Sequence, residues 1–294
     1  MKLELEYTRA FALLPARICE AAAEAAGSLE ANDRLSELRL RIDRPASLTV
    51  NGENRFLPIS CTAAELKGAV LALSGGSPYA YSDCIRKGYI PLENGLRLGV
   101  CPSASAGGSL DGITSICLRF PFVGKPKQPL DELVLDGGRV VSTMFYSPPG
   151  VGKTTVLRQL AAKLSGKERA LRCVVVDSRG ELYMKKFASG TLCEYIFGYE
   201  KGEGIELAAR SLSPEVIICD EIGSASDADA VIAAQNTGIP IIASAHADSF
   251  ASLMRRPHLK RMFDAAIFER YIGIRRDYAS NCYEFERASY DSRI

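Results

Sequence analysis

The chain has 294 residues, with 36 Lys and Arg against 35 Asp and Glu, so its formal net charge is +1. At about 150 residues per domain, this length predicts two domains or one large domain. Hydrophobic residues make up 47% and charged residues 24% of the sequence, the balance of an ordinary globular protein. A charge this close to zero argues against a protein built mainly to neutralise the phosphates of nucleic acid.

Cysteine and histidine usage argues against a zinc site and against a disulfide framework. The nine cysteines are scattered, no two of them form a C-x-x-C pair, and His246 and His258 are the two histidines. Residues 1–10 carry two glutamates and no apolar core, so we expect no secretory signal. No run of about 18 apolar residues occurs, and a membrane-spanning helix is therefore not expected. These features predict a cytoplasmic protein.

Residues 1–120 read as a mixed α+β domain. Residues 14–26 are rich in alanine and predict a helix, with a proline suited to its first turn and a glycine to its end. Residues 62–73 predict a second helix that begins at a capping box of Thr62 and Glu65. Alternating apolar and polar residues and Asn-Gly turn signals predict strands over residues 35–41 and 47–50, a turn at Asn51-Gly52, a hairpin over residues 90–100 with its turn at Asn94-Gly95, and a strand over residues 113–120.

Residues 121–129 separate this domain from the next. They hold three prolines, one glycine and two lysines, a composition typical of a linker. Residues 130–294 then alternate between strand and helix patterns, which predicts an α/β domain of parallel strands joined by crossover helices. The expected strands cover residues 139–146, 171–176, 216–219 and 239–245, the expected helices residues 153–164, 205–213 and 227–235, and a closing hairpin residues 266–274 and 281–286.

Residues 147–155 read SPPGVGKTT and lie between a predicted strand and a predicted helix. They match the phosphate-loop pattern G-x-x-x-x-G-K-[ST] at every defined position except the first, where Ser147 replaces glycine. In such a loop the amides and the helix N-terminus surround a phosphate, Lys153 reaches the β- and γ-phosphates, and the Thr154 hydroxyl ligates Mg²⁺. The segment therefore predicts binding of ATP and Mg²⁺ by Pro149, Gly150, Val151, Gly152, Lys153, Thr154 and Thr155.

The predicted strand over residues 216–219 runs into two adjacent acids, Asp220 and Glu221. Paired with the phosphate loop, Asp220 is expected to hold Mg²⁺ through water. Glu221 is expected to polarise the water that attacks the γ-phosphate. The adjacent glutamate favours an ATPase that hydrolyses with water over a small-molecule kinase.

Two more predicted strands end in polar residues. Asp177 and Glu181 follow the strand over residues 171–176, and His246 closes the strand over residues 239–245. The carboxyl ends of parallel strands carry the active site in an open α/β sheet, so these side chains are catalytic candidates, His246 as a sensor of the γ-phosphate. The alternatives are an ordinary turn for the two acids and a structural histidine. Arg210 is a further catalytic candidate, with a solvated helix charge as its alternative.

The order of these motifs resembles that of secretion-type ATPases of the type II and type IV secretion superfamily. Those proteins carry a phosphate loop, an acidic box, a Walker B strand and a histidine box in this order. Within the superfamily, the sequence is similar nearly end to end to the stage III sporulation protein AA family. The similarity is carried by residues 35–42, 44–45, 88–90, 95–100, 112–116, 149–158, 236–239, 256–257 and 268–271.

The resemblance implies a RecA-like P-loop ATPase domain with a parallel sheet, preceded by a smaller α+β domain. It places Asp177 and Glu181 in the acidic box, where Ser178 stands at a position that the family gives to glutamate. It also implies a mother-cell ATPase in endospore formation, which energises a channel together with membrane proteins. A ring, expected to be a hexamer, would lie on the cytoplasmic face of the membrane. Candidates for an arginine that reaches a neighbouring subunit's phosphate are Arg97, Arg119 and Arg179.

Two other functions stay open. Ser147 and Ser178 depart from the motif patterns and favour a scaffold that binds nucleotide for assembly with little hydrolysis. A nucleic-acid-linked ATPase is the other alternative, because related domains are fused to single-strand-binding modules. Nothing after residue 274 looks like such a module, and nucleic acid is not the expected partner. The leading hypothesis is a motor in which hydrolysis moves the first domain against the second through residues 121–129.

Overall fold

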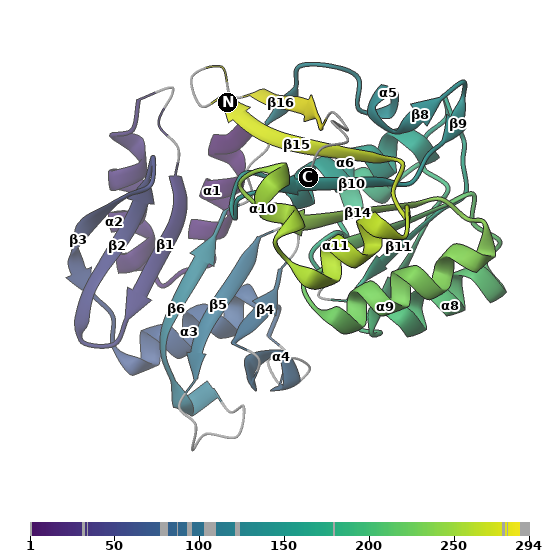
Figure 1. Ribbon diagram of the computed structural model, residues 1–294. Coiled ribbons are helices and arrows are strands. Elements are labelled where there is room, and N and C mark those ends of the chain that lie inside the picture. The colour runs from purple at the N-terminus through teal and green to yellow at the C-terminus, as the bar shows by residue number, and fades with distance from the viewer. Residues whose placement is uncertain are drawn as a thin grey trace. The chain divides into compact units, whose positions relative to one another are not determined.

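The computed structural model describes residues 2–30, 33, 35–76, 82–86, 88–92, 96–102, 110–120, 124–178, 180–277, 280 and 282–288. The chain divides into two compact units, Met1–Phe122 and Val123–Ile294, each with its own sheet (Figure 1). The division falls inside the segment 121–129 that the sequence marks as a linker. Part of that segment, Lys125–Pro126, forms strand β7 in the sheet of the second unit.

The first unit is built on an antiparallel sheet with the strand order β3-β2-β1-β6-β5-β4. Asn51 and Gly52 join β2 to β3 with φ values of 52° and 86°, the left-handed conformation that an Asn-Gly hairpin turn requires. The expected pairing of β4 with β5 is confirmed, but their turn at Asn94-Gly95 lies outside the described residues. The strands are β1 (Leu35–Arg41), β2 (Arg44–Val50), β3 (Glu53–Ser60), β4 (Tyr89–Pro91), β5 (Arg97–Pro102) and β6 (Ile113–Arg119).

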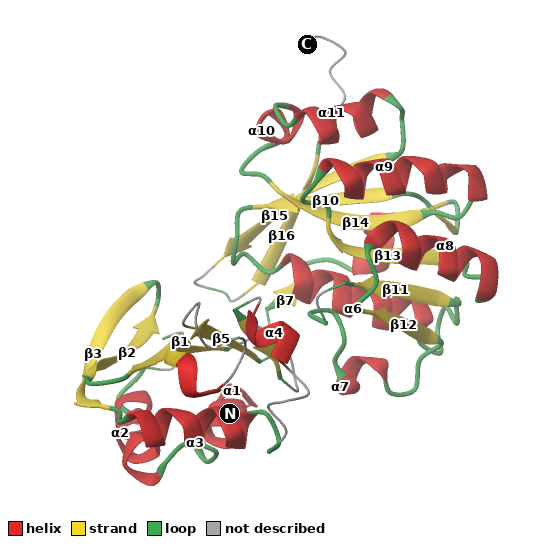
Figure 2. Ribbon diagram, turned by 90° about the horizontal axis from the view of Figure 1, so that it is seen from below, coloured by secondary structure: helices red, strands yellow, loops and turns green. Residues whose placement is uncertain are grey.

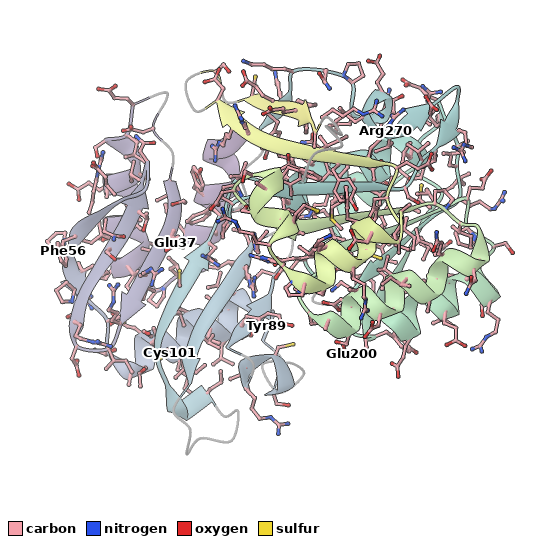
Figure 3. The ribbon with its side chains drawn as sticks, in the orientation of Figure 1. Glu37, Phe56, Tyr89, Cys101, Glu200 and Arg270 are labelled. Carbon is pink, nitrogen blue, oxygen red and sulfur yellow. The ribbon has the colours of Figure 1, made fainter. Side chains whose placement is uncertain are left out.

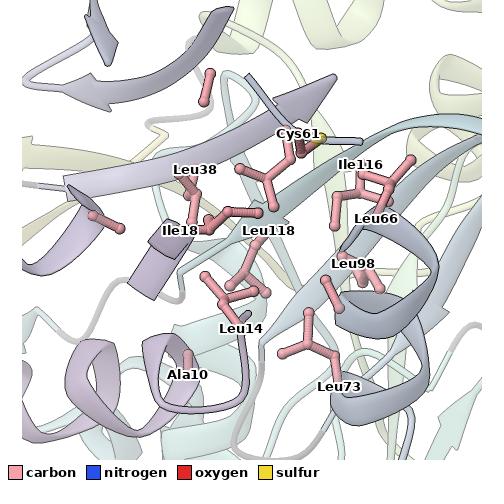
Figure 4. Packing of buried hydrophobic residues seen from close by; sticks show 14 of the residues in the cluster. Ala10, Leu14, Ile18, Leu38, Cys61, Leu66, Leu73, Leu98, Ile116 and Leu118 are labelled. Carbon is pink, nitrogen blue, oxygen red and sulfur yellow. The ribbon is translucent and has the colours of Figure 1, made fainter. Parts of the chain in front are cut away.

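Helices cover one face of this antiparallel sheet (Figure 2). Ile18 and Leu66, from two of these helices, share a buried cluster with Leu38 of β1 (Figure 4). Full burial of each such side chain contributes about 1.5–3 kcal/mol. The predicted capping box is confirmed, because Thr62 accepts the N–H of Glu65 and the Glu65 carboxylate accepts the N–H of Thr62. The helices are α1 (Lys2–Phe11), α2 (Ala16–Gly27), α3 (Ala63–Leu73) and α4 (Ser82–Arg86), with a 3₁₀ turn at Leu110–Gly112.

The second unit has a mixed sheet with the order β12-β11-β13-β14-β10-β15-β16-β7. In this order, each pair of neighbouring strands from β12 through β11, β13, β14 and β10 to β15 is parallel, whereas β16 is antiparallel to β15. The strand before the phosphate-loop motif, β10, therefore lies between β14 and β15. The strands are β10 (Thr143–Ser147), β11 (Cys173–Asp177), β12 (Cys193–Phe197), β13 (Val216–Glu221), β14 (Ile241–His246), β15 (Arg270–Asp277) and β16 (Cys282–Arg287), while β8 (Leu135–Asp136) pairs separately with β9 (Arg139–Val140).

Helices lie on both faces of this mixed sheet. Met144 and Tyr146 of β10 belong to a cluster with buried residues of α8, α9, α10 and α11, whereas Phe145 between them points to the other face. There α6, which contributes no residue to that cluster, contacts β10, β11 and β13. The helices are α5 (Leu130–Val134), α6 (Lys153–Ser165), α7 (Lys185–Ala188), α8 (Lys201–Ser211), α9 (Ala225–Ala234), α10 (Phe250–Met254) and α11 (Pro257–Asp264).

Arg270 joins the parallel sheet to the end of α5 (Figure 3). Its Nη1 donates to the carbonyls of Leu133 and Leu135 at 3.0 and 2.8 Å, and its Nη2 lies 3.2 Å from the Asp136 carboxylate. These carbonyls belong to the C-terminal turn of α5, where a cation complements the helix dipole. The contact fixes the chain that leads into β10.

The parallel α/β arrangement expected for the second unit is confirmed, and its elements differ in detail. The strand expected over residues 139–146 is two strands, because the Val141 N–H donates to the Val134 carbonyl and the Ser142 carbonyl accepts from Glu269. The helix expected from residue 205 begins at Lys201. The sequence did not anticipate α1, α4, α5, α7, α10, α11, β3, β7, β8 or β12. Among the described residues, no helix is both long and apolar enough to cross a membrane.

Candidate nucleotide-binding site

The loop between β10 and α6 has the backbone of an anion cradle. Gly150 and Gly152 have φ values of 76° and 129°, a region that side chains with a Cβ rarely adopt. A Cβ at Gly152 would also overlap the ring of Tyr283 from β16. Gly152 is the N-cap of α6 and supplies no side-chain acceptor to its first turn. The loop therefore presents the start of a long helix to an anion, and it fits a phosphate.

Ser147, which replaces glycine at the first motif position, does not distort this loop. It is the last residue of β10, pairs in register with His246 of β14 and is 1% exposed. Its φ lies outside the left-handed region that would demand glycine. Its hydroxyl donates to the Pro148 carbonyl at 3.0 Å. A serine is thus compatible with a phosphate loop here.

Lys153 is held inside the loop. Its Nζ donates to the Ser147 carbonyl at 3.1 Å and lies 2.6 Å from Nδ1 of His246. The lysine is 7% exposed, and burial lowers its pKa to about 8, with Glu221 opposing and Arg256 adding to the effect. A phosphate in the loop would add a charge-assisted contact to a cation that its present carbonyl and imidazole contacts leave with a lowered pKa.

His246 connects Lys153 to Glu221. Its Nε2 lies 2.8 Å from Oε2 of Glu221. With Nδ1 accepting from the lysine ammonium, Nε2 carries the hydrogen that it donates to the carboxylate. The three side chains come from the start of α6 and from the carboxyl ends of β14 and β13, which parallel strands bring to one edge. The sequence named all three, and the structure brings them together.

Asp220 has a partner that the sequence did not reveal. Oδ1 of Asp220 lies 2.7 Å from Nζ of Lys201, the first residue of α8, and Asp227 lies 3.5 Å from the same nitrogen. Burial raises the pKa of Asp220 to about 6, and Lys201 opposes that rise. Burial also acts to lower the pKa of Lys201, but the two carboxylates outweigh it and raise that pKa. No local pattern marks Lys201, since its burial depends on how α8, α9 and β13 pack.

Asp177 is fully buried and organises a turn. Its carboxylate accepts the N–H groups of Glu181, Leu182 and Tyr183 at 2.8, 2.7 and 3.0 Å. Burial raises its pKa, although the three amides act against that rise. The Glu181 carbonyl in turn accepts from Nε of the buried Arg158 of α6 at 2.9 Å. Both oxygens of Asp177 therefore accept N–H groups of the turn that follows β11. This arrangement corresponds to the alternative for Asp177, an ordinary turn without a nucleotide contact.

The structure does not bring Arg210 to this edge. Arg210 is in the last turn of α8, is exposed, and lies 3.3 Å from Glu206 one turn earlier. Because α8 runs back to the amino end of β13, its last turn is at the opposite edge of the sheet. The structure therefore favours the alternative for Arg210, a solvated charge on a helix. In the first unit, Arg119 pairs with Glu37 and Arg97 lies over the Tyr89 ring. Arg179 lies outside the described residues.

The donor groups at this edge suit Mg²⁺ and a polyphosphate. Thr154 is half-buried at the start of α6 and offers a hydroxyl oxygen, and Asp220 offers a carboxylate at the end of β13. Mg²⁺ prefers such oxygen ligands and usually takes one or two from the protein, with substrate phosphates and water completing its shell. The residues present therefore fit ATP with Mg²⁺.

The sequence matches a known protein family over most of its length. The sequence matches the family model described as sporulation stage III, protein AA, over residues 11–282. Stage III sporulation protein AA of Bacillus subtilis (strain 168) is 32% identical over 254 residues, which cover 82% of this chain and 83% of that protein.

Two solved structures share the fold at low sequence identity. The ATPase DotB of Legionella pneumophila has a TM-score of 0.58 at 16% identity, over 90% of this chain and 77% of DotB. The pilus retraction motor PilT with bound ADP has a TM-score of 0.56 at 13% identity, over 88% of this chain and 80% of PilT. The RecA-like fold and the resemblance inferred from the sequence are confirmed. The chain belongs to the sporulation stage III protein AA family.

Proposed function

We propose that this chain is an ATPase, which binds ATP with Mg²⁺ at residues 149–155 and hydrolyses it with water. The observation that carries the proposal is the connected set of Lys153, His246 and Glu221 beside a glycine-rich helix start. It joins a phosphate-binding cation to a carboxylate that can activate water. A structural turn has no need of this arrangement.

In this proposal Lys153 exchanges loop carbonyls for phosphate oxygens. Glu221 accepts the proton of a water whose oxygen attacks the γ-phosphorus, while the bond from that phosphorus to its bridging oxygen breaks. His246 holds Glu221 in place and contacts Lys153, so it registers whether the lysine has turned to a phosphate. Bound Mg²⁺, held by Thr154 and Asp220, supplies positive charge for the phosphate oxygens.

We further propose a motor of the secretion-ATPase kind. Family membership supports a role in sporulation, with membrane proteins of a channel complex as partners on the cytoplasmic face. The fold shared with the ATPase DotB and the retraction motor PilT supports a ring, proposed to be a hexamer, that converts hydrolysis into movement. The proposed organisation is a domain over residues 1–120, a linker over residues 121–129 and an ATPase domain over residues 130–294.

Phosphate release by the purified chain tests the proposal. It is measured with ATP and MgCl₂ over a wide range of protein concentration, for the wild type, Lys153→Ala and Glu221→Gln. The proposal expects release that rises faster than linearly with protein concentration and is lost in both variants. Release that survives in Lys153→Ala would overturn the assignment of the site.

A nucleotide-binding scaffold is the second candidate, and one observation favours it. Oε2 of Glu221 and Oδ1 of Asp220 already have the close partners His246 and Lys201 at 2.8 and 2.7 Å. If these partners stay in place, nucleotide binds and drives assembly with little hydrolysis. ATP-dependent oligomers without phosphate release, also after a membrane partner is added, would select the scaffold.

A further inference from the structure

A cluster of three charges includes the candidate metal ligand Asp220: Lys201 and Asp220 are buried, and Asp227 is half-buried. Lys201, with 7% of its side chain exposed, has its Nζ 2.7 Å from Oδ1 of Asp220 and 3.5 Å from Oδ1 of Asp227. The lysine follows Glu200, the N-cap of α8 (Figure 3). Of this cluster, the proposed function uses Asp220 alone.

Helix stability does not account for a lysine at this position. The N-terminal end of a helix carries partial positive charge, which disfavours a cation in the first turn. Burial of the ammonium adds a desolvation cost that must be offset by partners. A residue that contradicts local preference in this way is expected at a functional site.

Glycines bring Lys201 to the cluster. A Cβ at Gly202 would lie 3.2 Å from Cβ of Ala230 in α9, and one at Gly204 would lie 2.6 Å from Cγ1 of Val176 in β11. The first turn of α8 is therefore pressed against both α9 and β11. The two glycines weaken the helix but allow this approach.

Asp227 fixes the lysine from the other side. Its Oδ2 accepts the N–H groups of Gly223 and Ser224, both at 3.0 Å, as part of the capping box of α9. Its Oδ1 is left to face Lys201. The ammonium is thus held by a strand end and a helix start, and its release would leave the buried Asp220 and the half-buried Asp227 without their cation.

We propose that Lys201 is a positioning residue for the metal site: it binds Oδ1 of Asp220 and so turns Oδ2 toward the Mg²⁺ that accompanies ATP. This inference rests on the proposed function. A lysine that instead competed with the metal for Asp220 would have the opposite effect on Mg²⁺ affinity. Residues that orient a metal ligand typically change metal affinity 10- to 100-fold when they are replaced.

The test measures Mg²⁺ dependence of nucleotide binding, apart from hydrolysis. Binding of a fluorescent, slowly hydrolysed ATP analogue is followed in EDTA and then during titration with MgCl₂, for the wild type and Lys201→Met. We expect the MgCl₂ midpoint to rise at least about tenfold in Lys201→Met, with affinity in EDTA within about twofold of the wild type. Lys201→Arg, which keeps the charge, should recover part of the shift. Lys260→Met, at an exposed lysine of α11, is the matched control and should not move the midpoint.

An unchanged or lower midpoint in Lys201→Met overturns the inference, the lower one in favour of competition. If that variant does not fold, Asp227→Asn replaces it: the asparagine can keep the helix cap and removes one of the two anions that hold the lysine. A raised midpoint in Asp227→Asn then supports positioning, and an unchanged midpoint overturns it. A wild type that binds no analogue with or without Mg²⁺ instead overturns the proposed function, and this inference falls with it.

Discussion

Nζ of Lys153 lies 2.6 Å from Nδ1 of His246, so the cation of the phosphate loop and the last residue of β14 are in direct contact. The other ring nitrogen of His246 is 2.8 Å from Glu221. One imidazole therefore joins the group proposed to bind phosphate to the group proposed to activate water. A change at either end reaches the other through a single side chain.

Replacing His246 should separate binding from hydrolysis. In His246→Ala we expect phosphate release to fall about 100-fold, because Glu221 loses the group that orients it. Affinity for the ATP analogue should change less than about threefold, since the loop amides and Lys153 remain. Single-turnover phosphate release and analogue binding give the two numbers. His258→Gln, at the second histidine, is the control; an equal loss of binding and release in His246→Ala would contradict the role given to His246.

A side chain at Gly152 should destabilise the protein for two reasons, the backbone conformation of this residue and the contact of an added Cβ with Tyr283. Its φ of 129° costs a residue with a Cβ about 1–3 kcal/mol, and the same Cβ would meet the ring of Tyr283. Gly152→Ala should therefore lower the free energy of unfolding by more than Gly198→Ala, where φ is 74° and nothing lies within 4 Å of the added carbon. Urea unfolding of both variants measures the difference. Equal losses would mean that Tyr283 moves aside without cost.

The sequence identified the part of the site that follows strand ends. Lys153, Asp220, Glu221 and His246 each stand at the junction of an apolar run and a loop, and parallel strands bring such junctions together. Arg210 was a candidate because it is close to Asp220 along the chain, but the structure does not place it at the site. Since α8 runs antiparallel to β13, that closeness places the two residues at opposite edges of the sheet.

Other features depend on packing that no local pattern records. Lys201 is 19 positions before Asp220, and its burial follows from the contacts of Gly202 and Gly204 with neighbouring elements. Asp177 ends a strand as Asp220 does, yet its carboxylate turns back onto three amides of its own loop. Whether an acid at a strand end faces a ligand or its own backbone is decided by the next few φ and ψ angles, which the residue types leave open.

In the nucleotide-free protein, the contribution of Lys153 to stability should rise with pH above 8. Burial lowers the pKa of Lys153 to about 8, whereas a lysine in an unfolded chain titrates near about 10.4. Between these values the unfolded chain binds more protons, so the free energy of unfolding increases with pH, by up to about 3 kcal/mol. Lys153→Met lacks this contribution. In urea unfolding from pH 7.5 to 10, the difference in free energy of unfolding, wild type minus Lys153→Met, should increase with pH, and a difference that stays constant would contradict the lowered pKa of the buried lysine.

Asp177 and Glu181 should differ in how much they contribute to the free energy of unfolding, although the family pattern groups them in one acidic box. In Asp177→Asn an amide group replaces an oxygen that accepts backbone N–H groups, so at least one buried amide loses its acceptor, at about 1–3 kcal/mol. We expect the free energy of unfolding to fall by about 2 kcal/mol, and phosphate release to fall only as far as the turn is disturbed. Glu181→Gln, the matched control four residues later, should leave stability within about 0.5 kcal/mol, because its side chain is only half-buried. Urea unfolding and phosphate release are measured for both. Full stability with abolished release in Asp177→Asn would reverse the assignment, because a carboxylate committed to its own turn cannot also be the group that the reaction requires.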